Sequence, residues 1–235
     1  MGSARWRATF RERLDCGSGT ATFRFDKPQG YSFVPGQFVM LTLTTAEGEQ
    51  TKIFSHCDAP GDPYIEITTR LSGSAFKNAL EALRPSDEVG MSGPGGRFTV
   101  PEGCRKAAFL VGGVGITPAR SIIRDAVLRS TGLAVALFFG NQDQSCIPFG
   151  EELAGYAASH PEIEVVNVLA VPEAGWEGET GFITAETVRR HVEGLDGWHW
   201  FVCGPPAMVT AMERVVADLG LPDESVSFER FGGYA

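Results

Sequence analysis

Residues 107–118 read AAFLVGGVGITP, and this stretch decides how the second half of the chain folds. An unbroken apolar run of five residues is typical of a strand that is buried on both faces, as in a parallel sheet. The glycines that follow allow a tight turn, and Pro118 suits the first turn of a helix. The stretch therefore predicts a strand, a glycine-rich turn and a helix in succession.

The turn Gly112–Pro118 has the composition of a phosphate-binding loop. Glycines let backbone N–H groups approach a pyrophosphate, and the start of the following helix adds partial positive charge. We expect Thr117 to cap that helix and to offer its hydroxyl. Because Pro118 replaces the third glycine of the G-x-G-x-x-G pattern, the same loop also fits a tight strand–helix turn without a ligand.

Beyond this stretch, apolar runs continue to alternate with helical patterns. The predicted strands are 107–111, 134–140, 164–170, 198–203 and 225–231, and the predicted helices are 118–130, 149–158, 184–193 and 206–219. This alternation predicts a five-stranded parallel sheet covered on both faces, which binds ligands at the carboxyl ends of its strands. Cys203-Gly204-Pro205-Pro206 would lie at that edge, either as a lip for a planar ring or as a buried cysteine in a kinked turn.

Before residue 104 the pattern is that of antiparallel strands. Apolar and polar residues alternate in short segments at 4–11, 20–26, 37–44, 51–56, 63–69 and 88–92, and one helix is expected at 74–83. Six short strands with one helix predict a small closed barrel, since closure removes exposed edges. We therefore predict two domains, a β-barrel over residues 1–104 and an α/β domain over residues 105–235.

The charge is distributed unevenly between these halves. The chain has 20 basic and 29 acidic residues, a net charge of −9, with 11 and 12 of them up to residue 104 and 9 and 17 beyond it. An acidic protein of this kind is not expected to bind nucleic acid. The basic residues gather on the first strand, where Arg5, Arg7, Arg11 and Arg13 would attract an acidic partner.

Other classes are excluded by composition. The longest nearly apolar stretch, 107–116, is too short to cross a bilayer, so no transmembrane segment is expected. The five cysteines are widely spaced and match no zinc or iron–sulfur pattern, so we expect reduced thiols, a cytoplasmic location and no metal site.

Two segments of the first half could hold an anionic aromatic ligand. Lys52-Ile53-Phe54-Ser55 supplies a cation, an aromatic ring and a hydroxyl, although an ordinary edge strand has the same composition. Gly73-Ser74-Ala75 opens the predicted helix, where it would bind an anion or simply cap the helix.

These motifs, taken in order over about residues 5–235, resemble the ferredoxin–NADP reductase superfamily. Further matching motifs are the Pro35–Phe38 turn, the Arg70–Leu80 stretch and Gly93–Phe98. The resemblance implies a six-stranded Greek-key β-barrel that binds a flavin, followed by an NAD(P)-binding α/β domain. FAD is implied, with FMN as a possibility, and NADH or NADPH is implied as the substrate.

The resemblance also implies roles for individual residues. The family's flavin motif is Arg-x-Tyr-Ser, and Lys52-Ile53-Phe54-Ser55 stands in its place, with a lysine that cannot form the bidentate contact of arginine. Ser55, Cys203 and Glu229 are the implied catalytic residues. The implied cofactor-binding residues are Lys52, Ile53, Phe54, Ser55, Thr68, Arg70, Gly73, Ser74, Ala75, Gly113, Gly115, Thr117, Cys203, Gly204, Pro205, Phe231 and Tyr234.

Three functions remain open at the level of sequence. The first is an FAD-dependent NAD(P)H oxidoreductase that passes electrons to a separate acceptor, such as a small acidic iron–sulfur protein, an oxygenase component or a small molecule. The second is an NAD(P)H:flavin reductase that uses free flavin as a substrate, and the third is a redox-inactive interaction subunit. The stretch 140–145 holds Asp143 and no basic residue, which favours NADH because an acid repels the 2′-phosphate of NADPH.

Overall fold

The structure is a computed structural model that describes residues 5–17 and 19–232. Its elements in chain order are β1 (Arg5–Asp15), β2 (Thr20–Asp26), β3 (Phe38–Thr45), β4 (Gly48–Ser55), β5 (Tyr64–Arg70), α1 (Ala75–Glu81), β6 (Glu88–Gly95), β7 (Lys106–Gly112), α2 (Ile116–Leu128), β8 (Ala134–Asn141), α3 (Gly150–Ser159), β9 (Ile163–Leu169), β10 (Glu179–Thr180), α4 (Ala185–His191), β11 (His199–Gly204), α5 (Pro206–Leu219) and β12 (Val226–Arg230).

The first six strands form one antiparallel sheet in the order β4-β3-β6-β1-β2-β5. Because side chains alternate between the two faces of a strand, Ala21, Phe23 and Phe25 of β2 point into the core of the half-barrel. Phe76 and Leu80 of α1 pack in the same core. The sheet is a half-barrel rather than the closed barrel expected. Within the described residues, β4 and β5 form no ladder. The backbone N–H of Cys57, just beyond β4, donates a hydrogen bond of 3.0 Å to the carbonyl of Glu66 in β5.

The second sheet is parallel, in the order β10-β9-β8-β7-β11-β12. Its central strand β7 is buried on both faces from Ala107 to Gly112, as the unbroken apolar run predicts. The expectation of five strands is corrected to six, because β10 adds the two-residue pairing of Glu179–Thr180 with β9. A strand of two residues is too short to show an apolar run or an alternation in the sequence, so β10 could not be predicted.

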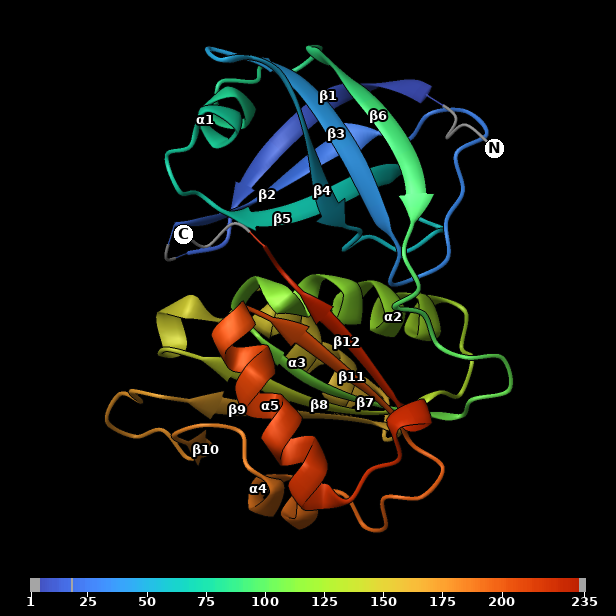
Figure 1. Cartoon of the computed structure of the whole chain (residues 1–235), viewed down its shortest axis with the longest axis vertical. Coiled ribbons are helices and arrows are strands. Elements are labelled where there is room, and N and C mark those ends of the chain that lie inside the picture. The colour runs from blue at the N-terminus through green and yellow to red at the C-terminus, as the bar shows by residue number, and fades with distance from the viewer. Residues whose placement is uncertain (1–4, 18, 233–235) are drawn as a thin grey trace.

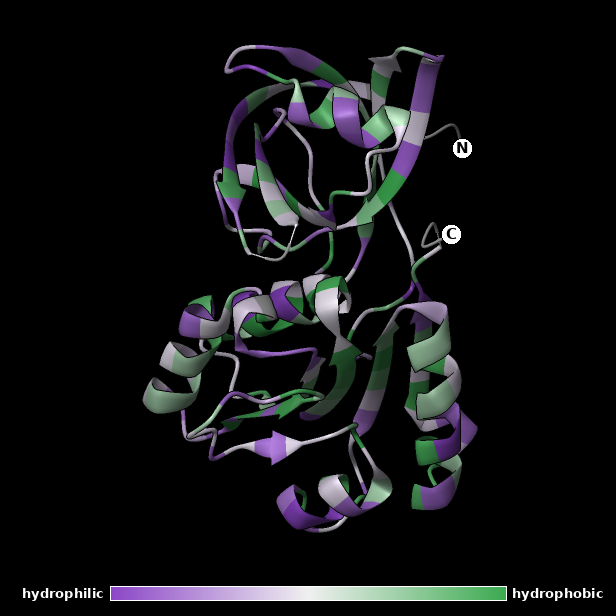
Figure 2. Cartoon of the chain, turned by 90° about the vertical axis from the view of Figure 1, so that its left-hand side faces the viewer, coloured by the Kyte–Doolittle hydropathy of each residue, from purple (hydrophilic) through white to green (hydrophobic). Residues whose placement is uncertain are grey.

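Helices cover both faces of this sheet (Figure 1). Side chains of α2 and α3 pack with one set of strand residues, and those of α4 and α5 pack with the other. Figure 2 shows the strands of this sheet mostly in hydrophobic colours, between helices that carry hydrophilic residues. The predicted order of an antiparallel barrel followed by an α/β unit is confirmed.

Helix α2 lies between the second sheet and the half-barrel (Figure 1). One side of α2 contributes Ile116, Ala119 and Ile123 to the core of the second sheet, while Arg120 and Arg124 bind acidic residues of the first half. The boundary at residues 104 and 105 stays a prediction. Phe98, which precedes that boundary, packs in the core of the second sheet.

No helix among the described residues is long and apolar enough to cross a membrane.

Candidate functional site

The three predicted catalytic residues meet where the two halves of the chain face each other. Ser55 is the last residue of β4, and Cys203 and Glu229 lie opposite each other on the paired strands β11 and β12. The Ser55 hydroxyl donates a hydrogen bond of 3.4 Å to Glu229 Oε1, across 174 residues of sequence. The fold thus brings together a hydroxyl, a thiol and a carboxyl from both sheets.

Burial sets the protonation of this cluster near neutral pH. It raises the pKa of the Glu229 carboxyl to about 7, although the hydrogen bond from Ser55 partly opposes the shift. Burial and the nearby Glu229 charge raise the pKa of the Cys203 thiol well above its ordinary value. Cys203 is therefore a neutral thiol rather than a nucleophile, and Glu229 is the group of the cluster that exchanges a proton near pH 7.

A cavity of about 320 Å³ opens beside Glu229. It is lined by residues of both halves, namely Phe38, Gly96, Arg97, Phe98, Ser227, Phe228 and Glu229. Gly95 and Gly96 make room for the Phe38 ring, since a Cβ atom at Gly95 would lie 2.7 Å from it. The cavity is therefore shaped by the glycines at the end of β6 and directly after it.

The remaining residues of the Lys52–Ser55 segment differ in exposure. Lys52 and Ile53 are exposed, whereas Phe54 is buried with its ring centroid 5.8 Å from that of Phe76. The ammonium group of Lys77, in the first turn of α1, lies 4.4 Å from the centre of the Phe54 ring. The Lys77 ammonium and the Phe54 ring are thus in contact, and the charge of Lys52 contributes to a lowered pKa of Lys77.

The other predicted flavin residues of the first half have local roles. The Thr68 hydroxyl is hydrogen-bonded to Thr22 Oγ1 at 2.6 Å and lies 3.3 Å from Cys57 Sγ. Arg70 is exposed at the end of β5. Ser74 caps α1 by accepting a hydrogen bond of 3.4 Å from the backbone of Lys77, as the capping alternative predicts.

Gly73 and Ala75 flank this cap. Gly73 has a φ of +73°, a conformation that favours glycine, and Ala75 is the first residue of α1. The segment therefore has the backbone of a helix start, and its role toward a flavin stays a prediction.

The glycine-rich loop after β7 packs directly on the end of β11. A Cβ atom at Gly115 would lie 2.4 Å from the carbonyl oxygen of Cys203 and 2.8 Å from the Cα atom of Gly204. Gly113 has a φ of +52°, and a Cβ atom there would meet nothing within 4 Å. Gly115 is thus required for close packing, while Gly113 leaves the loop surface open.

One local expectation at this edge is corrected. Thr117 does not cap α2: Gly115 holds the cap position, and the buried Thr117 hydroxyl donates to the carbonyl of Val114 at 3.0 Å because it points back into the first turn. Pro205 is the cap residue of α5, without a side-chain hydrogen bond.

Phe231, directly after β12, lies at the same edge. The Phe231 backbone N–H donates to the Gly204 carbonyl at 3.1 Å, and its ring packs against the core of the second sheet. Tyr234, the other predicted aromatic contact, lies outside the described residues.

Sequence reasoning missed a set of buried ion pairs between the halves. Arg120 of α2 binds the Glu66 carboxylate and donates to the Cys57 carbonyl at 2.5 Å. Arg124, one turn later, binds both oxygens of Asp62 at 2.7 Å. The available signal was Glu66, a charged residue between the two apolar residues Ile65 and Ile67.

The basic face expected on β1 is largely neutralised. Arg11 pairs with Asp26, and Arg13 pairs with Asp15 at 2.8 Å and with Glu81 at 3.2 Å. The side chain of Arg5 is not among those that the structure describes, so only Arg7 keeps the predicted character of an exposed cation.

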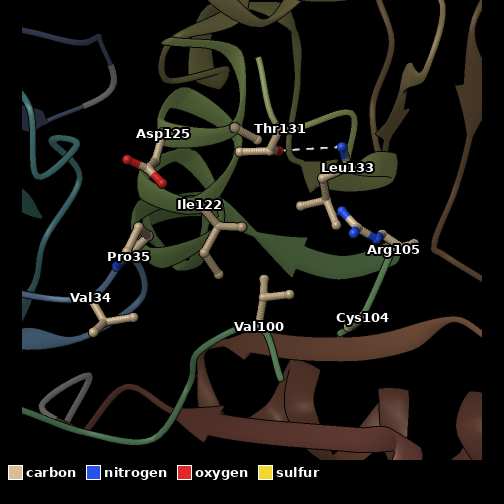
Figure 3. A pocket seen from close by; sticks show the side chains of 10 residues that line it. Val34, Pro35, Val100, Cys104, Arg105, Ile122, Asp125, Thr131 and Leu133 are labelled. Atoms are coloured by element: carbon tan, nitrogen blue, oxygen red, sulfur yellow. Dashed lines mark hydrogen bonds between the residues drawn. The ribbon is translucent and has the colours of Figure 1, made fainter. Parts of the chain in front are cut away.

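A second cavity, of about 180 Å³, lies between α2 and the segments that precede β3 and β7 (Figure 3). Val34, Pro35, Val100, Ile122 and Leu133 give it an apolar lining, and Asp125 and Arg105 stand at its sides. It shares no residue with the Ser55–Glu229 cluster. Among the described side chains, no group of three potential ligands could hold a metal ion.

Comparisons with known proteins agree with this arrangement. The family profile of the oxidoreductase NAD-binding domain matches residues 109–214. The ferredoxin–NADP reductase B of Sorangium cellulosum is 29% identical, over 88% of this chain and 89% of that protein. The reductase component of the naphthalene 1,2-dioxygenase system of Pseudomonas putida is also 29% identical, and the match covers 88% of this chain but 62% of the relative.

The fold is shared with solved structures as well. A ferredoxin–NADP⁺ reductase from Neisseria gonorrhoeae, solved with bound FAD and NADP, superposes with a TM-score of 0.82 at 19% identity, covering 96% of this chain and 97% of that one.

Proposed function

We propose that this chain, which is similar to members of the ferredoxin–NADP reductase superfamily over most of its length, is an FAD-dependent NAD(P)H oxidoreductase that delivers electrons to a separate acceptor. The observation that carries the proposal is the contact of Ser55 with Glu229, opposite Cys203. It places residues of the half-barrel and of the nucleotide-binding sheet around one point, as a two-cofactor reaction requires.

The residues around this point fit a flavin. Phe54 offers an aromatic ring, Lys52 and Lys77 offer positive charge for a phosphate, and the cavity beside Glu229 joins both halves. When bound, FAD would accept a hydride from the nicotinamide and release electrons to the acceptor. The protein's part is to orient the two rings and to exclude water.

We assign the following tasks to individual residues. The packing of Gly115 on Cys203 and Gly204 brings the loop after β7 against the end of β11, which positions a nicotinamide at the thiol. The Ser55 hydroxyl orients the Glu229 carboxyl. Because the pKa of Glu229 is about 7, this carboxyl can hold or release one proton under physiological conditions.

Two relatives are named as ferredoxin reductases, and one of them belongs to a dioxygenase system. Their names support an iron–sulfur protein or an oxygenase component as the acceptor of this chain. Because residues such as Arg11 and Arg13 are already paired with acids, binding of an acidic acceptor would depend less on β1 than its sequence suggests.

The alternative of a flavin reductase is favoured by one specific observation. The cation at the position of the family's arginine is Lys52, an exposed side chain that cannot bind a phosphate through two parallel hydrogen bonds. Flavin would then bind more weakly and could leave after reduction.

An anaerobic absorbance spectrum of the purified protein tests these functions together. We expect a flavin spectrum with about one flavin per chain, which NADH or NADPH bleaches before any acceptor is added. Protein that purifies colourless but reduces added flavin would support the flavin reductase instead. Bound flavin that neither nucleotide bleaches would overturn both functions and leave a redox-inactive subunit.

A further inference from the structure

A buried histidine directly follows Ser55, and the proposed function gives it no task. His56 is fully buried, and hydrogen bonds occupy both nitrogens of its ring: Nε2 lies 2.8 Å from the Tyr31 hydroxyl, and Nδ1 lies 3.0 Å from Asp58 Oδ1. The Phe33 ring stacks on the imidazole, with 3.7 Å between the ring centroids. The His56 side chain is therefore fixed both in position and in rotation.

Stability alone does not explain the buried trio Tyr31, His56 and Asp58. Asp58 is fully buried, and burial raises the pKa of its carboxyl. Its Oδ2 atom has no hydrogen-bond partner among the described residues, and an unpaired buried acceptor destabilises a folded protein. Apolar side chains of similar volume would pack without this cost. The trio therefore points to a task beyond packing.

His56 anchors the end of β4, where Ser55 lies. The His56 backbone N–H donates to the Gln37 carbonyl at 3.0 Å, and Ser55 pairs with Phe38 at the end of the ladder between β3 and β4. The backbone of His56 is thus tied to the turn before β3, while its side chain is tied to the interior of the half-barrel. A shift of Ser55 away from Glu229 would strain both sets of contacts.

The trio also reaches the second half of the chain. The Asp58 carbonyl accepts a hydrogen bond of 2.6 Å from the Ser121 hydroxyl of α2. Helix α2 packs on the same sheet that carries Glu229. A continuous set of contacts therefore runs from Ser55 through His56 and Asp58 to the half of the chain that supplies Glu229.

We propose that His56 is a positioning residue, which holds the Ser55 hydroxyl against Glu229 and is itself held by Tyr31 and Asp58. The inference rests on the proposed function for the use of the Ser55–Glu229 contact in catalysis, whereas the contact itself can be measured without turnover.

The Glu229 carboxyl reports the position of the Ser55 hydroxyl. A hydrogen bond to the carboxylate favours its charged form, so the bond from Ser55 lowers the pKa of Glu229 against the effect of burial. Cys203 on the paired strand and Arg97 in the wall of the adjoining cavity are titratable groups near Glu229, and the test leaves both unchanged. A rise of the Glu229 pKa thus measures the displacement of Ser55.

The test is a titration of Glu229 in the purified full-length protein, followed by NMR of isotope-labelled glutamate carboxyl carbons, with Glu229→Gln identifying the signal. We expect Ser55→Ala to raise the midpoint by roughly 0.5–1 pH unit, because the carboxylate loses a donor. His56→Leu should raise it by a similar amount. The double variant should show no further rise, because both changes remove the same contact.

Tyr31→Phe keeps the test decisive if His56→Leu folds poorly. It removes only the hydroxyl that is bonded to His56, and it should raise the midpoint by a smaller amount, roughly 0.2–0.5 pH unit. Tyr64→Phe is the matched control in the same half-barrel, because the Tyr64 ring instead lies 4.5 Å from the Arg24 guanidinium carbon. The control should leave the midpoint unchanged.

Kinetics with bound flavin add a second measurement. His56→Leu should lower kcat roughly tenfold and change the KM for NADH by less than about threefold, since a misplaced Ser55 affects the reacting geometry more than binding. Tyr64→Phe should change neither value.

The outcomes separate this inference from the function on which it rests. If His56→Leu is less stable but titrates at the unmodified midpoint, its role is purely structural and the inference is wrong. Additive rises in the double variant, or an unchanged midpoint in Ser55→Ala, would also overturn it. If only Tyr31→Phe folds, an unchanged midpoint there decides against it. If neither NADH nor NADPH reduces bound flavin, the proposed function fails, while the titration still decides the inference.

Discussion

At the scale of single residues, the Glu229 carboxyl determines how the candidate site responds to pH. Its pKa of about 7 in the folded protein exceeds the value near 4.3 that a glutamate has in an unfolded chain. The folded state therefore binds more protons between these values. The resulting stability is fully present below about pH 4.3 and is lost as the pH rises through about 7.

We expect Glu229→Gln to remove this pH dependence. At pH 8 the variant should be more stable than the unmodified protein by about 1–3 kcal/mol, since it no longer has to bury a charge, and near pH 4.5 the difference should nearly vanish. Chemical denaturation at both pH values measures this. Glu224→Gln, at an exposed position, is the control, and equal differences at the two pH values would contradict the prediction.

Gly115 allows the loop after β7 to pack directly against the end of β11, because it has no Cβ atom. Because a Cβ atom there would lie 2.4 Å from the Cys203 carbonyl oxygen, Gly115→Ala must separate the loop after β7 from β11. We expect a loss of stability of about 1–3 kcal/mol and an increase in the KM for NADH. Denaturation and steady-state kinetics measure the two effects.

Gly155→Ala is the matched control for this substitution. Gly155 lies in α3, where a Cβ atom would meet nothing within 4 Å, so alanine there should leave the protein equally stable or slightly more stable. Identical behaviour of the two variants would show that the close packing at Gly115 is unimportant.

At the scale of elements, the strands that show an apolar run or an alternation of apolar and polar residues could be predicted from sequence, and β10, which shows neither, could not. The run at 107–111 became β7 at Lys106–Gly112, because a central parallel strand needs apolar residues on both faces. β10 was missed because its two residues form no pattern. The closure of the barrel was overestimated, because a strand pattern carries no information about which edge strands pair.

The turn after β8 is the element that should distinguish NADH from NADPH. Asp143 accepts hydrogen bonds from the backbone N–H of Ser145 at 3.0 Å and from its hydroxyl at 2.7 Å, and so caps the short helical turn Gln144–Cys146. The carboxylate thus stands just beyond the carboxyl end of a parallel strand, where such sheets bind nucleotides.

We expect Asp143→Arg to raise the ratio of kcat/KM for NADPH to that for NADH by roughly tenfold, because arginine attracts the 2′-phosphate that aspartate repels. Asp143→Asn separates charge from structure, since its side-chain oxygen can still cap the turn. Steady-state kinetics with both nucleotides measure the ratio, and an unchanged ratio in Asp143→Arg would reject this turn as the determinant.

At the scale of the whole molecule, ion pairs buried between the halves hold α2 against the half-barrel. Arg120 binds Glu66, which lies 54 residues away in sequence, and Arg124 binds Asp62, 62 residues away. Such pairs cannot be predicted from local patterns, because neither partner identifies the other. The same limit applies to Ser55 and Glu229, whose proximity only a resemblance to a known family could suggest.

We expect Arg120→Met to lower the free energy of unfolding by about 3 kcal/mol, because it leaves the buried Glu66 carboxylate without this partner. Arg129→Met is the control in the same helix region, since Arg129 is exposed and its pair with Asp125 spans one turn. The control should lose less than about 1 kcal/mol. Chemical denaturation measures both, and equal losses would contradict a special role for the buried pair.

The position of Phe98 has a consequence for recombination between reductases. Its ring lies 5.0 Å from that of Phe201 and belongs to the core of the second sheet, although it follows the last strand of the first. A chimaera of two reductases joined at residue 104 would take the Phe98 ring from one parent and the core residues that it packs against, such as Phe201, from the other. A junction placed just before Gly96 would instead transfer Phe98 together with the core residues that it contacts. The segment that can be exchanged as one unit therefore begins several residues before the change in sequence pattern at residue 104.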